Sequence, residues 1–82
     1  MTRQETFDRL VEQLRCPDIA AKVEKIESLC KKERILGIDF HIKRASNMLD
    51  SLQKATDSDR QIYETSFDTS IKTILNLLDK YS

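Results

Sequence analysis

The sequence predicts an all-α protein, a small bundle of three or four antiparallel amphipathic helices joined by short loops. One glycine, Gly37, and one proline, Pro17, leave too few turn-forming residues for a sheet protein. Along most of the chain, apolar residues recur every three or four positions, which is the period of one helix face. A chain of 82 residues is too short for two domains, so we expect residues 1–82 to form one helical domain.

The first helix is expected over residues 3–15. Thr2 and Glu5 have the spacing of a capping box, in which the two side chains satisfy free amides at a helix start. The apolar positions that follow lie on one face: Phe7, Leu10, Val11 and Leu14. Arg3 and the other charged residues of this segment are expected to lie mostly in solvent.

A second helix is expected over residues 17–35, because Pro17 suits a first helical position. Gly37 is the expected stop, since glycine adopts the left-handed cap conformation without steric cost. One kinked helix over residues 17–55 is the alternative, because the apolar spacing continues across Gly37. We favour a break, since the stripe before residue 31 is out of phase with the stripe after it and glycine costs about 1 kcal/mol inside a helix.

Two further helices are expected over residues 38–55 and 58–80. Ser58 and Gln61 repeat the capping-box spacing, and Asp59 supplies negative charge to the first turn of the last helix. Each helix carries about two heptad-like repeats, too few for a firm coiled-coil assignment. Leu75 and Leu77 flank the stripe of the last helix, and this wide apolar face favours a bundle. We predict these core residues: Phe7, Val11, Leu14, Val23, Ile26, Ile42, Leu49, Ile71, Ile74 and Leu78.

The chemistry-bearing residues do not predict an enzyme, a cofactor or a metal site. The one histidine, His41, has no partner at a fixed local spacing, so we interpret it as a surface or boundary residue. Cys16 and Cys30 are expected to be free thiols, and neither C-x-x-C nor H-x-x-x-H supports a zinc site formed with His41. A single glycine excludes a glycine-rich phosphate loop.

Side chains that fit neither a core stripe nor a catalytic pattern are the candidate partner-binding residues. Phe40 lies off the stripe of its helix, as do Leu36 and Leu77, although a turn near Gly37 is an alternative that would bury Phe40. A basic patch over residues 31–44 could bind an acidic partner. Its alternative explanation is that these basic side chains interact favourably with the negative C-terminal end of the second helix. The full candidate set is Leu36, Phe40, Leu77, Lys31, Lys32, Arg34, Lys43 and Arg44.

We therefore expect a non-catalytic protein-interaction module that binds a protein partner or a second copy of itself. The alternative is a regulator that binds nucleic acid through the basic patch, and the zero net charge of the chain argues against it. Membrane attachment through the last helix is the weakest hypothesis, since it needs a basic, strongly amphipathic helix and residues 58–82 carry a net charge of −1. A charged N-terminus and the absence of a long apolar run predict a cytoplasmic or nuclear protein.

Overall fold

Four helices make up almost all of the chain in the computed structural model, which describes residues 2–81. They are α1 (Arg3–Arg15), α2 (Pro17–Glu33), α3 (Ile38–Lys54) and α4 (Asp57–Lys80). No strand occurs within the described residues. The all-α bundle expected from the sequence is confirmed, and the helix bounds agree with the predicted ones to within two residues.

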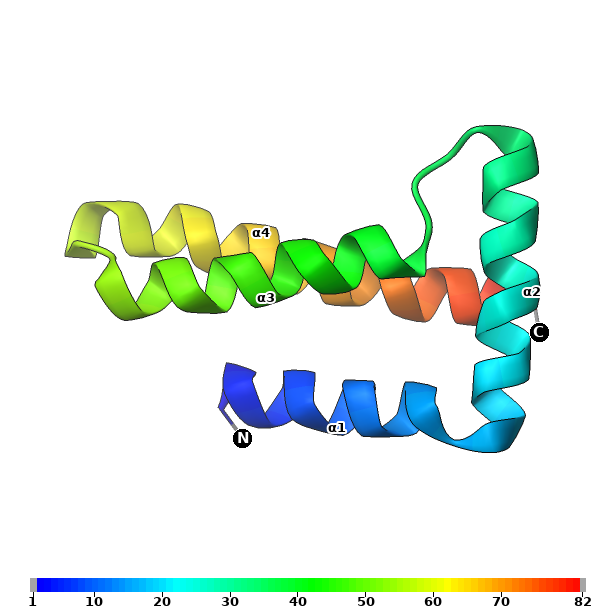
Figure 1. Ribbon diagram of the computed structural model, residues 1–82. Coiled ribbons are helices and arrows are strands. Elements are labelled where there is room, and N and C mark those ends of the chain that lie inside the picture. Colours follow the sequence, from blue (N-terminus) through cyan, green and yellow to red (C-terminus); the bar gives the residue numbers. More distant parts are fainter. Residues whose placement is uncertain (1, 82) are drawn as a thin grey trace.

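α1, α3 and α4 run along the length of the molecule, and α2 crosses their end (Figure 1). α3 and α4 form a long antiparallel hairpin, and α1 lies beside it. α2 crosses the end of this layer, so it is transverse to the bundle and not antiparallel to a neighbour. The molecule measures 39 × 26 × 16 Å, and the end of the hairpin extends past the start of α1 (Figure 1).

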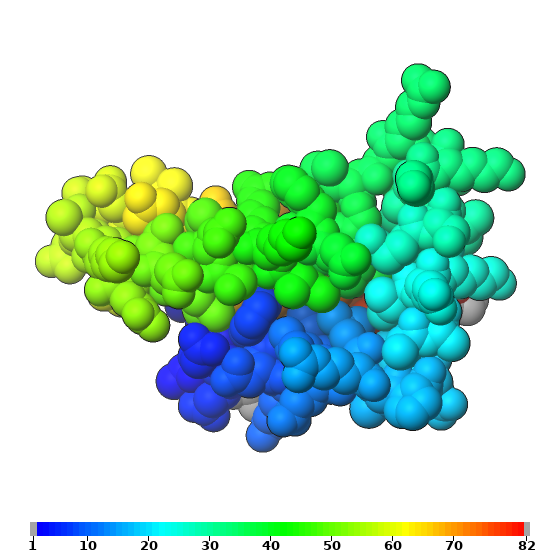
Figure 2. Space-filling model, viewed as in Figure 1, coloured from blue at the N-terminus to red at the C-terminus, as the bar shows by residue number. Residues whose placement is uncertain are grey.

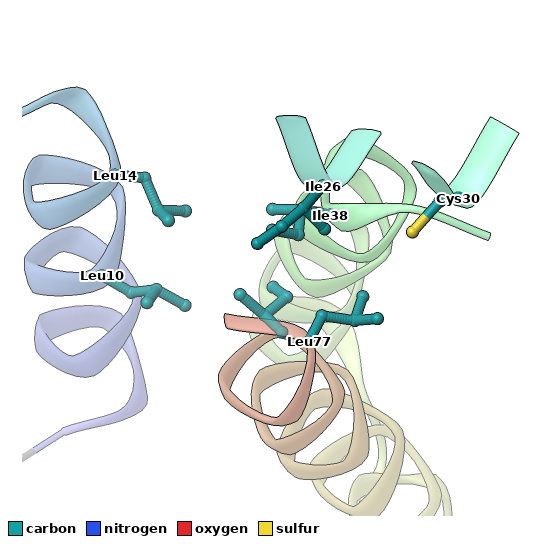
Figure 3. Close-up of a cluster of buried hydrophobic side chains, with 7 residues drawn as sticks. Leu10, Leu14, Ile26, Cys30, Ile38 and Leu77 are labelled. Atoms are coloured by element: carbon teal, nitrogen blue, oxygen red, sulfur yellow. The ribbon is translucent and has the colours of Figure 1, made fainter. Parts of the chain in front are cut away.

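The main hydrophobic core lies where α2 crosses the other helices. Leu10 and Leu14 of α1 point toward Ile26 of α2, Ile38 of α3 and Leu77 of α4 (Figure 3). A second, smaller cluster lies further along the hairpin and contains Ala45, Leu49 and Phe67, with Phe7 packed against it. The ring centroids of Phe7 and Phe67 are 6.4 Å apart.

The predicted core is right in part. Leu14, Ile26, Leu49 and Ile74 are buried. The other six predicted residues are only half-buried, and six further apolar side chains are buried in addition: Leu10, Cys30, Ile38, Ala45, Phe67 and Leu77. The difference arises because α2 crosses the layer, so the buried face of each helix is set by neighbours in two directions.

The helix start at Thr2 is confirmed, and the one at Ser58 is wrong. The Thr2 hydroxyl accepts a hydrogen bond from the Glu5 amide over 3.2 Å. α4 begins one residue early, at Asp57, with Thr56 in the N-cap position. The Thr56 hydroxyl lies 3.1 Å from the Ser58 hydroxyl and donates to the Asp59 carboxylate, so no side chain caps a backbone amide there. Asp59 does lie in the first turn, as predicted.

The break between α2 and α3 is confirmed, but its stop residue is Arg34 and not Gly37. Arg34 takes the left-handed conformation, with φ 59° and ψ 39°, and its amide donates to the Cys30 and Lys31 carbonyls. α2 therefore ends at Glu33, two residues before the predicted end. Gly37 has an extended backbone, with φ −93°, and is the N-cap residue of α3.

A side chain from α2 fills the space beside Gly37. Glycine offers no side-chain oxygen to the free amides of α3, and the Glu27 carboxylate supplies one by accepting a hydrogen bond from the Ile38 amide. A Cβ atom on Gly37 would lie 2.5 Å from Oε1 of Glu27. This contact joins the start of α3 to α2 across the four-residue connection between them.

Candidate partner-binding surface

The strongest candidate site is the corner where α2 turns into α3. Three large hydrophobic side chains within six residues of sequence are exposed there, at 44% for Ile35, 57% for Leu36 and 43% for Phe40. We call the corner surface these three residues together with the exposed basic residues Lys31, Lys32, Arg34, Lys43 and Arg44. In the space-filling view, side chains around the end of α2 project from the body at the upper right (Figure 2).

The backbone explains why Ile35 and Leu36 remain in solvent. The left-handed turn at Arg34 redirects the chain, and the Ile35 amide donates to the Cys30 carbonyl over 3.0 Å. Two residues after Leu36, Ile38 is completely buried in the main core. The exposed pair therefore sits on a short segment that is fixed at both ends.

Phe40 is exposed because it lies on the outer face of α3. The buried face of this helix carries Ile38, His41 and Ala45. Lys43 and Arg44, three and four residues after Phe40, share its outer face. The Phe40 ring also contacts the His41 ring edge-on, with centroids 5.3 Å apart. This contact restricts the orientation of the Phe40 ring and still leaves the ring exposed to solvent.

The charge of the corner surface is positive. Residues 31–44 contain five basic and two acidic side chains, a net charge of +3. The two ion pairs within residues 2–81 join Arg3 of α1 to Glu64 and Asp68 of α4. Neither of them involves a basic residue of the corner surface. Of the two acids, Glu33 accepts a hydrogen bond from the Tyr81 hydroxyl over 3.2 Å. The corner thus combines uncovered apolar area with available positive charge.

His41 is buried, which corrects its interpretation as a surface or boundary residue. Its side chain is 9% exposed, and its Nδ1 atom has no hydrogen-bond partner in the described part of the chain. Burial lowers the pKa of His41, and the positive charge of Arg44 lowers this pKa further, while Glu27 opposes the shift. The neutral imidazole is therefore the form that this fold accommodates.

Leu77 was a wrong prediction as a partner-binding residue. It is only 9% exposed and belongs to the main core with Leu10, Leu14 and Ile26. α2 crosses α4 near its end, so a position that lies off a simple heptad stripe still faces a neighbour. The remaining seven candidates are exposed, and together with Ile35 they make up the corner surface as defined above.

Three exposed hydrophobic residues were not predicted: Ile35, Ile62 and Leu75. Ile35 follows the true end of α2, which the prediction placed two residues too late. Ile62 directly precedes Tyr63, which begins the apolar series Tyr63, Phe67, Ile71 and Ile74 of the last helix, and this adjacent position was the available signal. Leu75 was noted only as a flank of the α4 stripe.

The two thiols lie in different environments. Both cysteines are free; Cys16 is exposed and Cys30 is buried. Burial raises the pKa of the Cys30 thiol, and the nearby Glu27 and Glu33 raise it further, which disfavours the thiolate. Across residues 2–81, no three histidine, cysteine, aspartate or glutamate side chains are grouped closely enough to hold a metal ion.

A cleft lies between the start of α1 and the hairpin. It has a volume of about 410 Å³, and Leu49 and Leu52 line it together with Arg3, Arg60 and Glu64. Arg3 was expected to lie mostly in solvent, yet its guanidinium donates two hydrogen bonds of 3.1 Å to the Asp68 carboxylate and contacts Glu64 at 2.9 Å. These ion pairs tie α1 to α4 and account for Arg3 and Glu64 beside the cleft.

Comparison with known proteins adds no identification. No family model, no curated protein and no solved structure matches the chain. Among the described residues, no helix is long and apolar enough to cross a membrane.

Proposed function

We propose that this chain is a non-catalytic protein-interaction module, a small helical subunit or adaptor that binds a partner through the corner surface. The observation that carries the proposal is the exposure of Ile35, Leu36 and Phe40 within six residues, on a segment whose backbone is fixed by Arg34, Gly37 and Ile38. A preorganised apolar surface loses little conformational entropy on binding.

The energetics favour a partner that covers these side chains. Removing a Leu or Phe side chain from water contributes about 2 kcal/mol, and a few such anchors carry most of the affinity of an interface. The net charge of +3 over residues 31–44 favours an acidic partner. The surface therefore suits a segment of a protein that presents apolar side chains next to carboxylates.

Nucleic acid is the second candidate, and the five exposed basic residues favour it. Two features make it the weaker one. The formal net charge of the chain is zero, and Phe40 is the one aromatic ring on the corner surface, so successive bases would find no stacking platform.

Action in the cytosol or the nucleus is part of the proposal. Two free cysteines, one of them exposed, suit a reducing compartment.

Affinity purification from the native source, followed by mass spectrometry, tests the proposal. The wild-type chain is compared with the double variant Leu36→Ser, Phe40→Ser and with the control Leu75→Ser, which truncates a similarly exposed leucine on α4. We expect one or more proteins to be retained by the wild type and the control and lost from the double variant. Equal retention by all three chains contradicts the proposal, and retention that disappears after nuclease treatment supports the nucleic-acid candidate.

A further inference from the structure

The two ends of the molecule carry opposite charge. At one end is the corner surface, with a net charge of +3 over residues 31–44. At the other is the end of the α3–α4 hairpin, residues 50–64, which contain four acidic and two basic side chains, a net charge of −2. Figure 1 shows the two regions at opposite ends of the 39 Å long axis.

The hairpin end also exposes a large hydrophobic side chain. Ile62 is 63% exposed, more than any other large hydrophobic residue in the described chain. The buried face of α4 passes through Phe67, Ser70 and Ile74, and Ile62 lies outside it. α1 begins at Arg3, which pairs with Glu64 and Asp68 in the middle part of α4. The first turns of α4 therefore lie beyond the start of α1.

The exposed residues of the two regions have matching helical spacing. On α3, Lys43 and Arg44 follow Phe40 by three and four positions, and on α4 Ile62 follows Asp59 by three positions. Residues three and four apart on a helix are about 5–6 Å from each other on one face. Both helices therefore present an apolar side chain and a charge about one turn apart, with opposite signs of charge.

We propose that a second copy of this chain is a partner of the corner surface, and that the hairpin end of one copy docks there with Ile62 against Phe40 and Asp59 beside Lys43 and Arg44. This inference rests on the proposed function, because it names the occupant of the same surface. The two contact regions differ and lie at opposite ends of the molecule. The contact is therefore heterologous, and repetition produces an open head-to-tail chain instead of a closed dimer.

Sedimentation equilibrium on the purified protein tests this directly. Phe40→Ser removes the corner contact, Ile62→Ser removes the hairpin-end contact, and Leu75→Ser is the matched control on an exposed part of α4 outside both regions. Circular dichroism confirms that each chain remains helical. Lys43→Glu, which reverses an exposed charge of the same contact, replaces Phe40→Ser if that variant loses its fold.

The wild type and the Leu75→Ser control are expected to exceed the monomer mass of 9.6 kDa increasingly as concentration rises, and added salt should reduce this association. Each of the two contact variants alone should stay at the monomer mass. An equimolar mixture of the two should reach twice the monomer mass and stop there, because it contains one intact pair of surfaces per two chains.

A wild type that stays monomeric at every concentration overturns the inference, as does a mixture that stays monomeric. Association of Ile62→Ser alone would also overturn it, since that result indicates a symmetric contact between two corners. If the wild type is monomeric but a foreign protein is lost on Leu36→Ser, Phe40→Ser, the head-to-tail contact is wrong and the proposed function stands. If neither association depends on the corner surface, both are wrong.

Discussion

The Glu27 carboxylate on α2 caps α3 by accepting a hydrogen bond from the Ile38 amide. Glu27, eleven positions before Ile38, thus supplies the carboxylate oxygen that a serine or aspartate side chain usually supplies from the N-cap position. Gly37 has no side chain to cap the helix, so this contact joins the start of α3 to α2 beside the buried packing of Ile26 and Ile38.

Glu27→Ala is therefore expected to lower the free energy of unfolding by about 1 kcal/mol, within the range of lost N-caps. Glu24→Ala is the matched control, since Glu24 is an exposed glutamate on the same helix. Urea denaturation followed by circular dichroism measures both. Equal effects of the two substitutions would show that the Glu27 carboxylate does not cap α3.

Gly37→Ala should also lower stability, although the φ of Gly37 is accessible to alanine. Its new Cβ would displace the Glu27 carboxylate, which lies 2.5 Å from the Cβ position. The expected signature is non-additivity: the loss caused by Gly37→Ala should largely disappear when Glu27 is already alanine. A double-mutant cycle measures this coupling, and additive losses would argue against the contact.

His41 should make the fold less stable in mild acid. Its pKa is lowered in the folded state, so the unfolded chain binds a proton more readily. The contribution of the neutral His41 side chain to the free energy of unfolding is complete above the pKa of His41 in the unfolded chain, about 6.5. It decreases as the pH falls toward the lower pKa of His41 in the folded protein. The difference in unfolding free energy between wild type and His41→Leu should therefore fall on acidification from pH ~7, whereas a constant difference would mean that His41 has its ordinary pKa.

Neighbouring residues of α4 should respond very differently to truncation. Ile74 is fully buried in the main core, and Leu75 is 49% exposed. Ile74→Ala is expected to cost about 2–5 kcal/mol, and Leu75→Ala less than about 0.5 kcal/mol. Thermal or urea unfolding of the two variants checks the register of α4, and comparable losses would contradict it.

Much of the fold could be predicted from the sequence, because helix positions follow from local patterns. The Thr2–Glu5 spacing, the position of Pro17 and the apolar period located the helices to within two residues. The transverse course of α2 has no local signal. For that reason Leu77 was placed outside the core and His41 at its boundary, although both are buried.

The candidate surface was predicted in part for the same reason. Leu36 and Phe40 could be found because they lie off the apolar stripes, and the basic residues because they cluster in the sequence. All of them are exposed. The exposure of Ile35 was not predicted, because α2 ends at a left-handed Arg34 and no local sequence pattern predicts that conformation for an arginine. The Glu27–Ile38 and Arg3–Asp68 contacts join residues 11 and 65 positions apart, so only the packing of the helices reveals them.

The central claim, that the corner surface serves binding and not folding, is tested most directly by Phe40→Ser measured in two ways on the same sample. The account predicts that the free energy of unfolding changes by less than about 1 kcal/mol, because Phe40 is 43% exposed. It also predicts that association, with the captured partner or with a second copy, weakens at least about tenfold, which corresponds to about 1.4 kcal/mol. An unfolded variant would place Phe40 in the core, and an intact fold with wild-type association would contradict the claim.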